Sequence, residues 1–572
     1  MPFFLVESFA MATFPNDHKE VILHREQPTP LFRQFIARLD QHGCGAAIVK
    51  TPNKRINPMR IRSVSIFLSV PISILCGSAL AAATAAGTPA IIPDAGPHAV
   101  GLRIVQQYDY SRVMEAQVDA FGKTVNAESA RPIQIMIWYP AKRTNAAPMQ
   151  IADYRQAALS DVDFALPSAE AAKQRAAWMA GPQKVQYGAS TLAVRGAASA
   201  DGSFPVVIYA PSFASNAFEN LDLCEYLASQ GYVVMASRSL GARAPMMTDD
   251  IEGVEAQAAD IAFLANYAQT LPQADITKVA AAGFSWGGMA NVFAAARSSR
   301  IKALVSLDGS IRFHPKIWSA ATYVRPARTA VPMLFLGART ATAEAMERSE
   351  KFGASYLNAM KYSDVYVTTM PPMTHSDFSS WHLRFAGDNA FGDYQRADVL
   401  HAYRSGALYV HKFLDAYLKS DAKALAFMKK SPAGHGIGPQ VMSMETVPAK
   451  FVPVGEADFL RAYAKAGFKD AQNIYTDMAA SSPDFKVSPI NLNTWGYQQL
   501  GIKNARAAVE MFRLATHIEP NYGNAYDSEG EAYEALGETA LAIAAYEKAV
   551  AVDKRQTNAI ARLKDLRSGG VK

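Results

Sequence analysis

The chain has 572 residues, of which 50% are hydrophobic and 19% charged, and its formal net charge is +6. This length allows about three folded units, and the hydrophobic share excludes an intrinsically disordered chain. The three cysteines, Cys44, Cys76 and Cys224, are too few and too far apart for a disulfide-rich scaffold or a multi-cysteine zinc cluster.

Residues 59–81 have the pattern of a secretory signal peptide. Arg60 and Arg62 precede an apolar core of about 14 residues. That core is too short to cross a hydrocarbon layer of about 30 Å as a permanent helix, so we expect no stable membrane span. The triplet Ala79-Leu80-Ala81 suits signal peptidase. We therefore expect cleavage after Ala81 and export to a bacterial periplasm or the medium.

The stretch before the signal shows no periodicity and no recognisable chemistry. We interpret residues 1–58 as a non-native upstream extension, with Met59 as the native start. Residues 1–81 contain nine Lys and Arg against five Asp and Glu, so most of the excess positive charge lies in this region. The remainder of the chain is nearly neutral, and we expect no nucleic-acid partner.

The middle of the chain alternates short apolar runs with helical patterns. An early run at 133–139 is followed by an Ala- and Gln-rich, helical stretch at 150–200. Six further runs lie at 206–210, 232–236, 278–283, 303–308, 332–337 and 364–369. Apolar strands separated by helices predict an α/β fold with a mostly parallel sheet covered on both faces. We place this domain at 98–430, with the helix at 399–419 closing it.

A Gly-, Pro- and Met-rich stretch at 431–454 is predicted to be a linker, and residues 455–572 a helical domain. Within this domain the pattern Ala508, Phe512, Ala515 returns 34 residues later as Ala542, Tyr546, Ala549. The period and the small residues at helix contacts resemble tetratricopeptide repeats. About two repeats are present, fewer than the three that usually stack stably. We therefore expect them to pack on the α/β domain, on residues 455–480 or on a second chain, or to bind a protein partner. The alternative is a helical cap that has no partner.

The sharpest local signal is Gly283-Phe284-Ser285-Trp286-Gly287, which follows a predicted strand and precedes a helical run. A serine on a tight strand-to-helix turn needs glycine two residues before and after it, because side chains there would collide with neighbouring backbone. We identify Ser285 as the candidate nucleophile.

A serine hydroxyl needs a base, and the base needs an orienting acid. His375 lies in a loop directly after the last predicted strand, where its ring can reach the nucleophile's edge of the sheet; His382 is the second candidate. Asp308 ends the strand at 303–308 and is the candidate acid, while Asp377 is a weaker one because it lies beside His375 in the same loop.

With these residues in place, residues 100–420 resemble the α/β-hydrolase superfamily, and are similar to its dienelactone hydrolase and platelet-activating-factor acetylhydrolase branches. In the latter branch the acid follows the strand after the nucleophile's helix, as Leu307-Asp308 does, and the histidine motif resembles Thr374-His375-Ser376-Asp377-Phe378. The resemblance implies hydrolysis of a small-molecule ester through an acyl-enzyme, without a cofactor.

The resemblance also implies an oxyanion hole made by the backbone N–H groups of Phe213 and Trp286. That branch usually has His-Gly-x-Gly where this chain has Pro211-Ser212-Phe213-Ala214. Backbone donors do not depend on side-chain identity, but the loss of two glycines changes the loop. No His-Glu-x-x-His motif, cysteine pair or phosphate-binding Gly-rich loop is present in the sequence, and we predict no metal site.

We therefore expect an exported serine hydrolase with the triad Ser285, His375 and Asp308, followed by a helical repeat domain. Two alternatives remain open at this point. One is a serine peptidase with the same triad, and the other is a weakly active hydrolase domain that serves as a protein-interaction module.

Overall fold

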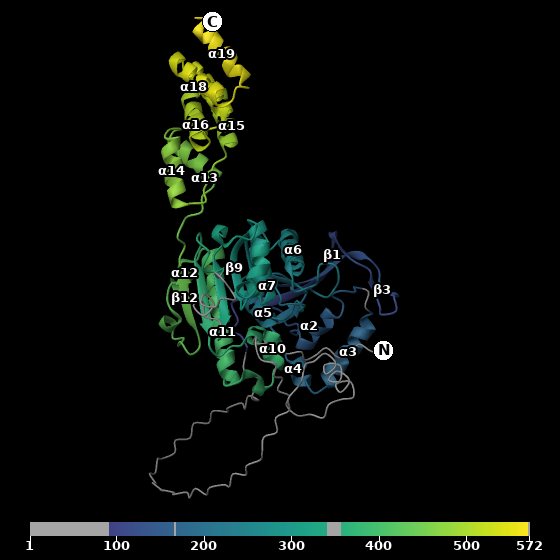
Figure 1. Ribbon diagram of the computed structural model, residues 1–572. Coiled ribbons are helices and arrows are strands. Elements are labelled where there is room, and N and C mark those ends of the chain that lie inside the picture. The colour runs from purple at the N-terminus through teal and green to yellow at the C-terminus, as the bar shows by residue number, and fades with distance from the viewer. Residues whose placement is uncertain (1–90, 165–166, 340–355, 570–572) are drawn as a thin grey trace, which may run out of the picture. The chain divides into compact units, whose positions relative to one another are not determined.

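A ten-stranded sheet forms the centre of the first part of the chain. The computed structural model describes residues 91–164, 167–339 and 356–569. The strands lie in the order β12-β11-β10-β9-β8-β6-β7-β4-β1-β5. Figure 1 labels β1, β9 and the edge strand β12 of this sheet. Their bounds are β1 Ala99–Met114, β4 Ser129–Ala141, β5 Ala193–Arg195, β6 Phe204–Ala210, β7 Val233–Ser237, β8 Ala274–Phe284, β9 Ile301–Leu307, β10 Met333–Ala338, β11 Val365–Met370 and β12 Ser443–Val447. A separate small hairpin joins β2 Gln117–Val118 to β3 Thr124–Asn126.

The strands from β7 through β6, β8, β9 and β10 to β11 run parallel, and β4 and β12 pair antiparallel with their neighbours. The chain leaves β6 toward β7 on one side and leaves β8 toward β9 on the other side, so the loops at the carboxyl ends of the neighbouring strands β6 and β8 flank a topological switch point. This arrangement is the α/β-hydrolase fold, which confirms the predicted fold class.

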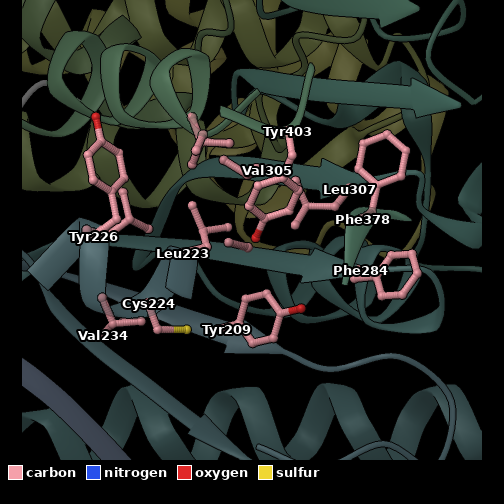
Figure 2. Close-up of a cluster of buried hydrophobic side chains, with 14 of the residues drawn as sticks. Tyr209, Leu223, Cys224, Tyr226, Val234, Phe284, Val305, Leu307, Phe378 and Tyr403 are labelled. Atoms are coloured by element: carbon pink, nitrogen blue, oxygen red, sulfur yellow. The ribbon is translucent and has the colours of Figure 1, made fainter. Parts of the chain in front are cut away.

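Side chains alternate between the two faces of the sheet, as the period of a strand requires. On β6, Val207 and Tyr209 belong to one buried cluster, and Val206 and Ile208 belong to the other. The first cluster is covered by α5 Leu221–Ser229 and α11 Arg396–Leu418, and Figure 2 shows part of it around Tyr209, Leu223 and Cys224. The second is covered by α6 Ile251–Tyr267 and α7 Trp286–Arg297. The predicted apolar runs are therefore strands buried on both faces.

Helices also follow the predicted pattern between 150 and 200, where α2 Ile151–Ala158, α3 Ser168–Ala180 and α4 Lys184–Gly188 lie. The remaining helices of this part are α8 Pro315–Ala320, α10 Ser380–Phe385 and α12 Ala422–Met428. The predicted closing helix at 399–419 is α11.

The predicted linker at 431–454 was wrong in part. Residues Ser443–Val447 form β12, which pairs antiparallel with β11 and makes one edge of the sheet. The α/β domain therefore extends beyond residue 430. The sequence of this strand lacks the apolar alternation that predicts a strand, because none of its residues is fully buried. It pairs through backbone groups, which do not depend on the side chains.

The C-terminal part is entirely helical in the region that the structure describes. Its helices are α13 Glu456–Lys465, α14 Ala471–Ser481, α15 Pro489–Gly501, α16 Ala505–Ile518, α17 Gly523–Ala535, α18 Thr539–Val552 and α19 Thr557–Arg567. The 34-residue repeat coincides with the pairs α15–α16 and α17–α18. In each pair a glycine makes room for an aromatic ring: a Cβ on Gly496 would lie 2.3 Å from Phe512, and one on Gly530 would lie 2.6 Å from Tyr546.

Residues 455–480, one of the three expected packing partners, contribute to the core of this helical part. Phe459 and Tyr463 of α13 are buried in one cluster with Met511 and Leu514 of α16. The helices α13 and α14 thus pack against the first helix pair of the repeats, α15–α16.

The predicted signal peptide at 59–81 and the predicted extension at 1–58 lie outside the described residues. Among the helices that the structure does describe, none combines the length and the apolar character needed to cross a bilayer.

Candidate active site

Ser285 occupies the turn between β8 and α7. Its backbone has φ 53° and ψ −115°, a region that L-residues rarely adopt and that costs about 1–3 kcal/mol. The turn is held on both sides, because the Ser285 N–H donates to the carbonyl of Leu307 at 3.0 Å and the N–H of Ser310 donates to the carbonyl of Ser285 at 2.8 Å. Both bonds connect the turn to β9 and the loop after it. The nucleophile candidate is therefore fixed by the neighbouring strand.

The glycines two residues away on either side are required by close backbone contacts. A Cβ on Gly283 would lie 2.6 Å from the carbonyl carbon of Gly287, and a Cβ on Gly287 would lie 2.1 Å from the carbonyl oxygen of Ala210. Backbone atoms at these distances cannot move aside as a flexible side chain could. This is the steric reason on which the sequence prediction of the turn depended.

His375 lies in the first turn after β11 and contacts both other members of the predicted triad. Its Nε2 is 2.9 Å from the Ser285 Oγ, and its Nδ1 is 2.6 Å from Asp308 Oδ2. An ionised carboxylate only accepts hydrogen bonds, so Nδ1 carries the proton and Nε2 is free to accept from the serine hydroxyl. The histidine ring also packs against Phe284, with 4.9 Å between the ring centroids.

Asp308 is 2% exposed and follows the end of β9 in a backbone conformation with φ 42°. Its Oδ1 accepts a hydrogen bond of 3.0 Å from the N–H of Ala338, at the end of β10, while Oδ2 accepts from His375. Each carboxylate oxygen therefore has one donor, and the acid cannot rotate without losing both.

The alternative candidates form a separate local arrangement. Asp377 accepts from the N–H and the hydroxyl of Thr374, both at 2.7 Å, and so caps its own turn. Its other oxygen is 3.6 Å from His382 Nε2. Burial lowers the pKa of His382, against the opposing effect of Asp377. The structure thus joins Ser285, His375 and Asp308 by hydrogen bonds. Asp377 and His382 lie near each other and make no hydrogen bond to these three residues.

The two predicted oxyanion donors lie on the loops after β6 and β8. The rings of Phe213 and Trp286 contact each other edge to face, with centroids 5.5 Å apart, and Trp286 also contacts His314 at 5.6 Å. Among the described residues, neither the Phe213 N–H nor the Trp286 N–H donates a hydrogen bond within the protein. Both donors remain available to a ligand oxygen.

Sequence reasoning missed the residues that support these loops. Glu219 and Asn220, just before α5, are buried and hydrogen-bonded to the loops that carry Phe213 and His375. Gln257 of α6 donates a hydrogen bond of 2.7 Å to the carbonyl of Pro211. Polar residues next to an amphipathic helix are usually solvent-exposed, and nothing in their spacing signals such a role.

No group of three His, Cys, Asp or Glu side chains that could hold a metal ion is found within residues 91–164, 167–339 and 356–569. Cys224 is 1% exposed, and burial raises the pKa of its thiol.

Residues 181–313 match the family model described as Chlorophyllase. The match covers about a quarter of the chain and includes Phe213, Ser285 and Asp308, but not His375. Over these residues the chain is similar to that family, and its sheet has the α/β-hydrolase fold. Among solved structures, the chain is similar to a ferulic acid esterase from Streptomyces cinnamoneus, with 20% identity and a TM-score of 0.43; the alignment covers 62% of this chain and 98% of that one. No curated protein matches the chain.

Proposed function

We propose that the protein is a serine hydrolase that cleaves carboxylic esters through a covalent acyl-enzyme. The observation that carries the proposal is the hydrogen-bonded series Ser285, His375 and Asp308 at the carboxyl edge of the sheet. The match of residues 181–313 to the chlorophyllase family favours an ester over a peptide as the substrate. A more specific placement, in the dienelactone hydrolase or platelet-activating-factor acetylhydrolase branch, is part of this proposal.

In the acylation step the Ser285 Oγ attacks the ester carbonyl carbon, while His375 Nε2 takes the hydroxyl proton. The carbonyl oxygen becomes an oxyanion, which the N–H groups of Phe213 and Trp286 stabilise. Asp308 stabilises the imidazolium through its bond to Nδ1 without taking the proton. The C–O bond to the alcohol then breaks, and His375 gives its proton to the leaving oxygen.

In the deacylation step a water molecule attacks the acyl-enzyme carbonyl. His375 removes one proton from the water, and the same two N–H groups stabilise the second oxyanion. Collapse returns the proton to the Ser285 Oγ and releases the carboxylic acid, so the atoms of one water are consumed per ester cleaved.

The proposal is tested with a fluorophosphonate probe and a series of p-nitrophenyl esters of increasing acyl length. We expect the probe to label Ser285, and Ser285→Ala to lose both labelling and about 10⁶-fold of kcat. Ser299→Ala, an exposed serine just after α7, is the matched control and should retain both. Absent labelling of the folded wild-type protein, or equal labelling of Ser285→Ala, would overturn the proposal in favour of an interaction module.

Dipeptide p-nitroanilides distinguish the remaining alternative. An esterase cleaves the ester series with kcat/KM values well above those for the anilides. The reverse ranking would assign the same triad to a peptidase.

We also propose export directed by residues 59–81, with residues 1–58 absent from the native protein. N-terminal sequencing of the exported protein should find a chain that starts at Ala82. A mature chain that retains residues 1–58 would refute this part of the proposal.

A protein partner or self-association through the helical repeats is likewise a proposal. Sedimentation velocity of the full chain over a wide concentration range tests self-association. A single monomeric species at all concentrations would exclude self-association and leave a different protein as the only partner proposed for the repeats.

A further inference from the structure

The loop after β6 has an unusual composition for an oxyanion loop. It contains no glycine between Pro211 and Ala214, yet Ala214 has φ 55°, in the left-handed region that favours glycine. Such a conformation persists only where surrounding contacts hold it. The loop must therefore be braced from outside.

Part of the brace acts on Pro211. Its carbonyl oxygen accepts from Gln257 Nε2 at 2.7 Å and from Ser239 Oγ at 3.3 Å. These bonds fix the start of the loop, next to the end of β6, but they do not reach the peptide that bears the Phe213 N–H.

The carboxylate of Glu219 acts directly beside that peptide. Its Oε2 accepts from the Ser212 N–H at 2.8 Å, and its Oε1 accepts from the Ser212 hydroxyl. Tyr209 donates a longer bond of 3.4 Å to Oε2. Glu219 is only 7% exposed, so water competes little for these donors. Because one carboxylate binds both the N–H and the hydroxyl of Ser212, it restrains the orientation of the next peptide, Ser212–Phe213.

The same segment also holds the loop that carries His375. The carbonyl oxygen of Glu219 accepts from the Trp381 N–H at 3.0 Å. Asn220 donates to the carbonyl of Phe378 at 2.9 Å and accepts from the Ser380 N–H at 2.7 Å. Two adjacent buried residues thus connect the oxyanion loop to the base loop.

We propose that Glu219 is a positioning residue for the oxyanion hole: its carboxylate clamps Ser212 and so aims the Phe213 N–H at the reacting carbonyl oxygen. The clamp does the work that glycines perform in the His-Gly-x-Gly form of this loop. The inference rests on the proposed ester hydrolysis.

The test compares Glu219→Ala, Glu219→Gln and Ser212→Ala with the full-length wild-type protein on a p-nitrophenyl ester. Glu219→Ala should lose about 10²–10³-fold in kcat and in kcat/KM alike, with KM nearly unchanged, because an oxyanion donor acts in the transition state and not in the bound substrate. Glu219→Gln can still accept from the Ser212 N–H and should recover most of the rate. Ser212→Ala removes one arm of the clamp and should fall between the two.

A second readout separates positioning from general destabilisation. A boronic acid forms a tetrahedral adduct with the serine and places an oxygen in the oxyanion hole, so its affinity should weaken by the same factor as kcat/KM across the variants. Glu225→Ala is the matched control. Glu225 is a second buried carboxylate of the same segment, 1% exposed, that binds Tyr154 and Leu192 and does not touch the loop. The Glu225→Ala substitution should lower thermal stability and leave kcat per labelled site unchanged.

The outcomes are distinguishable. An active wild-type protein with unchanged kcat per labelled site in Glu219→Ala overturns this inference alone. If Glu219→Ala does not fold, wild-type kcat and boronate affinity in Ser212→Ala overturn it equally. A wild-type protein that neither cleaves esters nor labels at Ser285 overturns the proposed function, and this inference with it.

Discussion

Gly287 shows how a single hydrogen atom in place of a methyl group shapes the active site. A Cβ at this position would lie 2.1 Å from the carbonyl oxygen of Ala210 and 2.6 Å from that of Pro211. Gly287→Ala must therefore separate the serine turn from the oxyanion loop. Since a displacement of about 1 Å can cost about 10²-fold in rate, we expect at least that loss in kcat/KM on a p-nitrophenyl ester.

The fold itself should survive this change, with a loss of about 1–3 kcal/mol from overpacking. Gly501→Ala provides the control, because a Cβ there meets nothing within 4 Å. Wild-type kcat/KM in a folded Gly287→Ala protein would contradict the steric account of the turn.

Glu225 gives a prediction about pH and stability. Burial raises its pKa from 4.5 to about 7, although hydrogen bonds from Tyr154 and Leu192 oppose the shift. The folded protein then retains a proton that the unfolded chain has released, so the free energy of unfolding falls as pH rises from about 4.5 to about 7. The fall attributable to this residue is about 3 kcal/mol at most, at about 1.36 kcal/mol per pKa unit.

Urea unfolding between pH 4.5 and pH 8 checks this prediction. Glu225→Gln is neutral throughout and should remove this part of the pH dependence, so the difference in stability between wild type and variant should change with pH and level off above pH 7. A constant difference over the range would show that Glu225 is ionised in the folded protein as readily as in the unfolded one.

At the scale of elements, the triad could be predicted because its three members each end a buried strand. Ser285, Asp308 and His375 follow β8, β9 and β11, and each of those strands carries a clear apolar run. The carboxyl ends of parallel strands share one edge, so strand prediction alone brings these side chains together.

The elements that escaped prediction lack such a signal. β1 runs for 16 residues, but most of its length is only partly buried, with Tyr110 84% exposed. Its pairing with β4 comes from backbone hydrogen bonds, which any sequence can make. Asn220 escaped for another reason, because its partners Phe378 and Ser380 lie about 160 residues further along the chain. The carboxylate of Glu219 binds Ser212, 7 residues earlier, but no residue pattern signals that contact.

The repeat offers a prediction at the same scale. Gly530 of α17 faces the buried ring of Tyr546 on α18, and a Cβ there would lie 2.6 Å from the ring. The Tyr546 hydroxyl is itself held by Glu534 at 2.6 Å, which limits how far the ring can move. Gly530→Ala should therefore destabilise the helical part by about 1–3 kcal/mol. Thermal unfolding followed by circular dichroism measures the loss, and Gly501→Ala again serves as the control.

At the scale of the whole molecule, the apolar cores divide along the chain. Two buried clusters draw only on residues between Ile91 and Val447, and two others draw only on residues between Val454 and Leu566. The α/β domain and the C-terminal helical part thus have separate cores. The triad and its supporting residues belong entirely to the α/β domain. Cooperative units of this kind unfold separately when few apolar contacts join them.

We therefore expect two transitions when the full chain is unfolded in a scanning calorimeter. Covalent modification of Ser285 by a phosphonate should shift only the transition of the α/β domain, since the ligand binds one folded unit. Gly530→Ala should shift only the other transition, and ester hydrolysis by this variant should stay at the wild-type level below its first transition. A single transition displaced by both changes would show that the two cores fold as one unit, and would make the helical repeats part of what stabilises the active site.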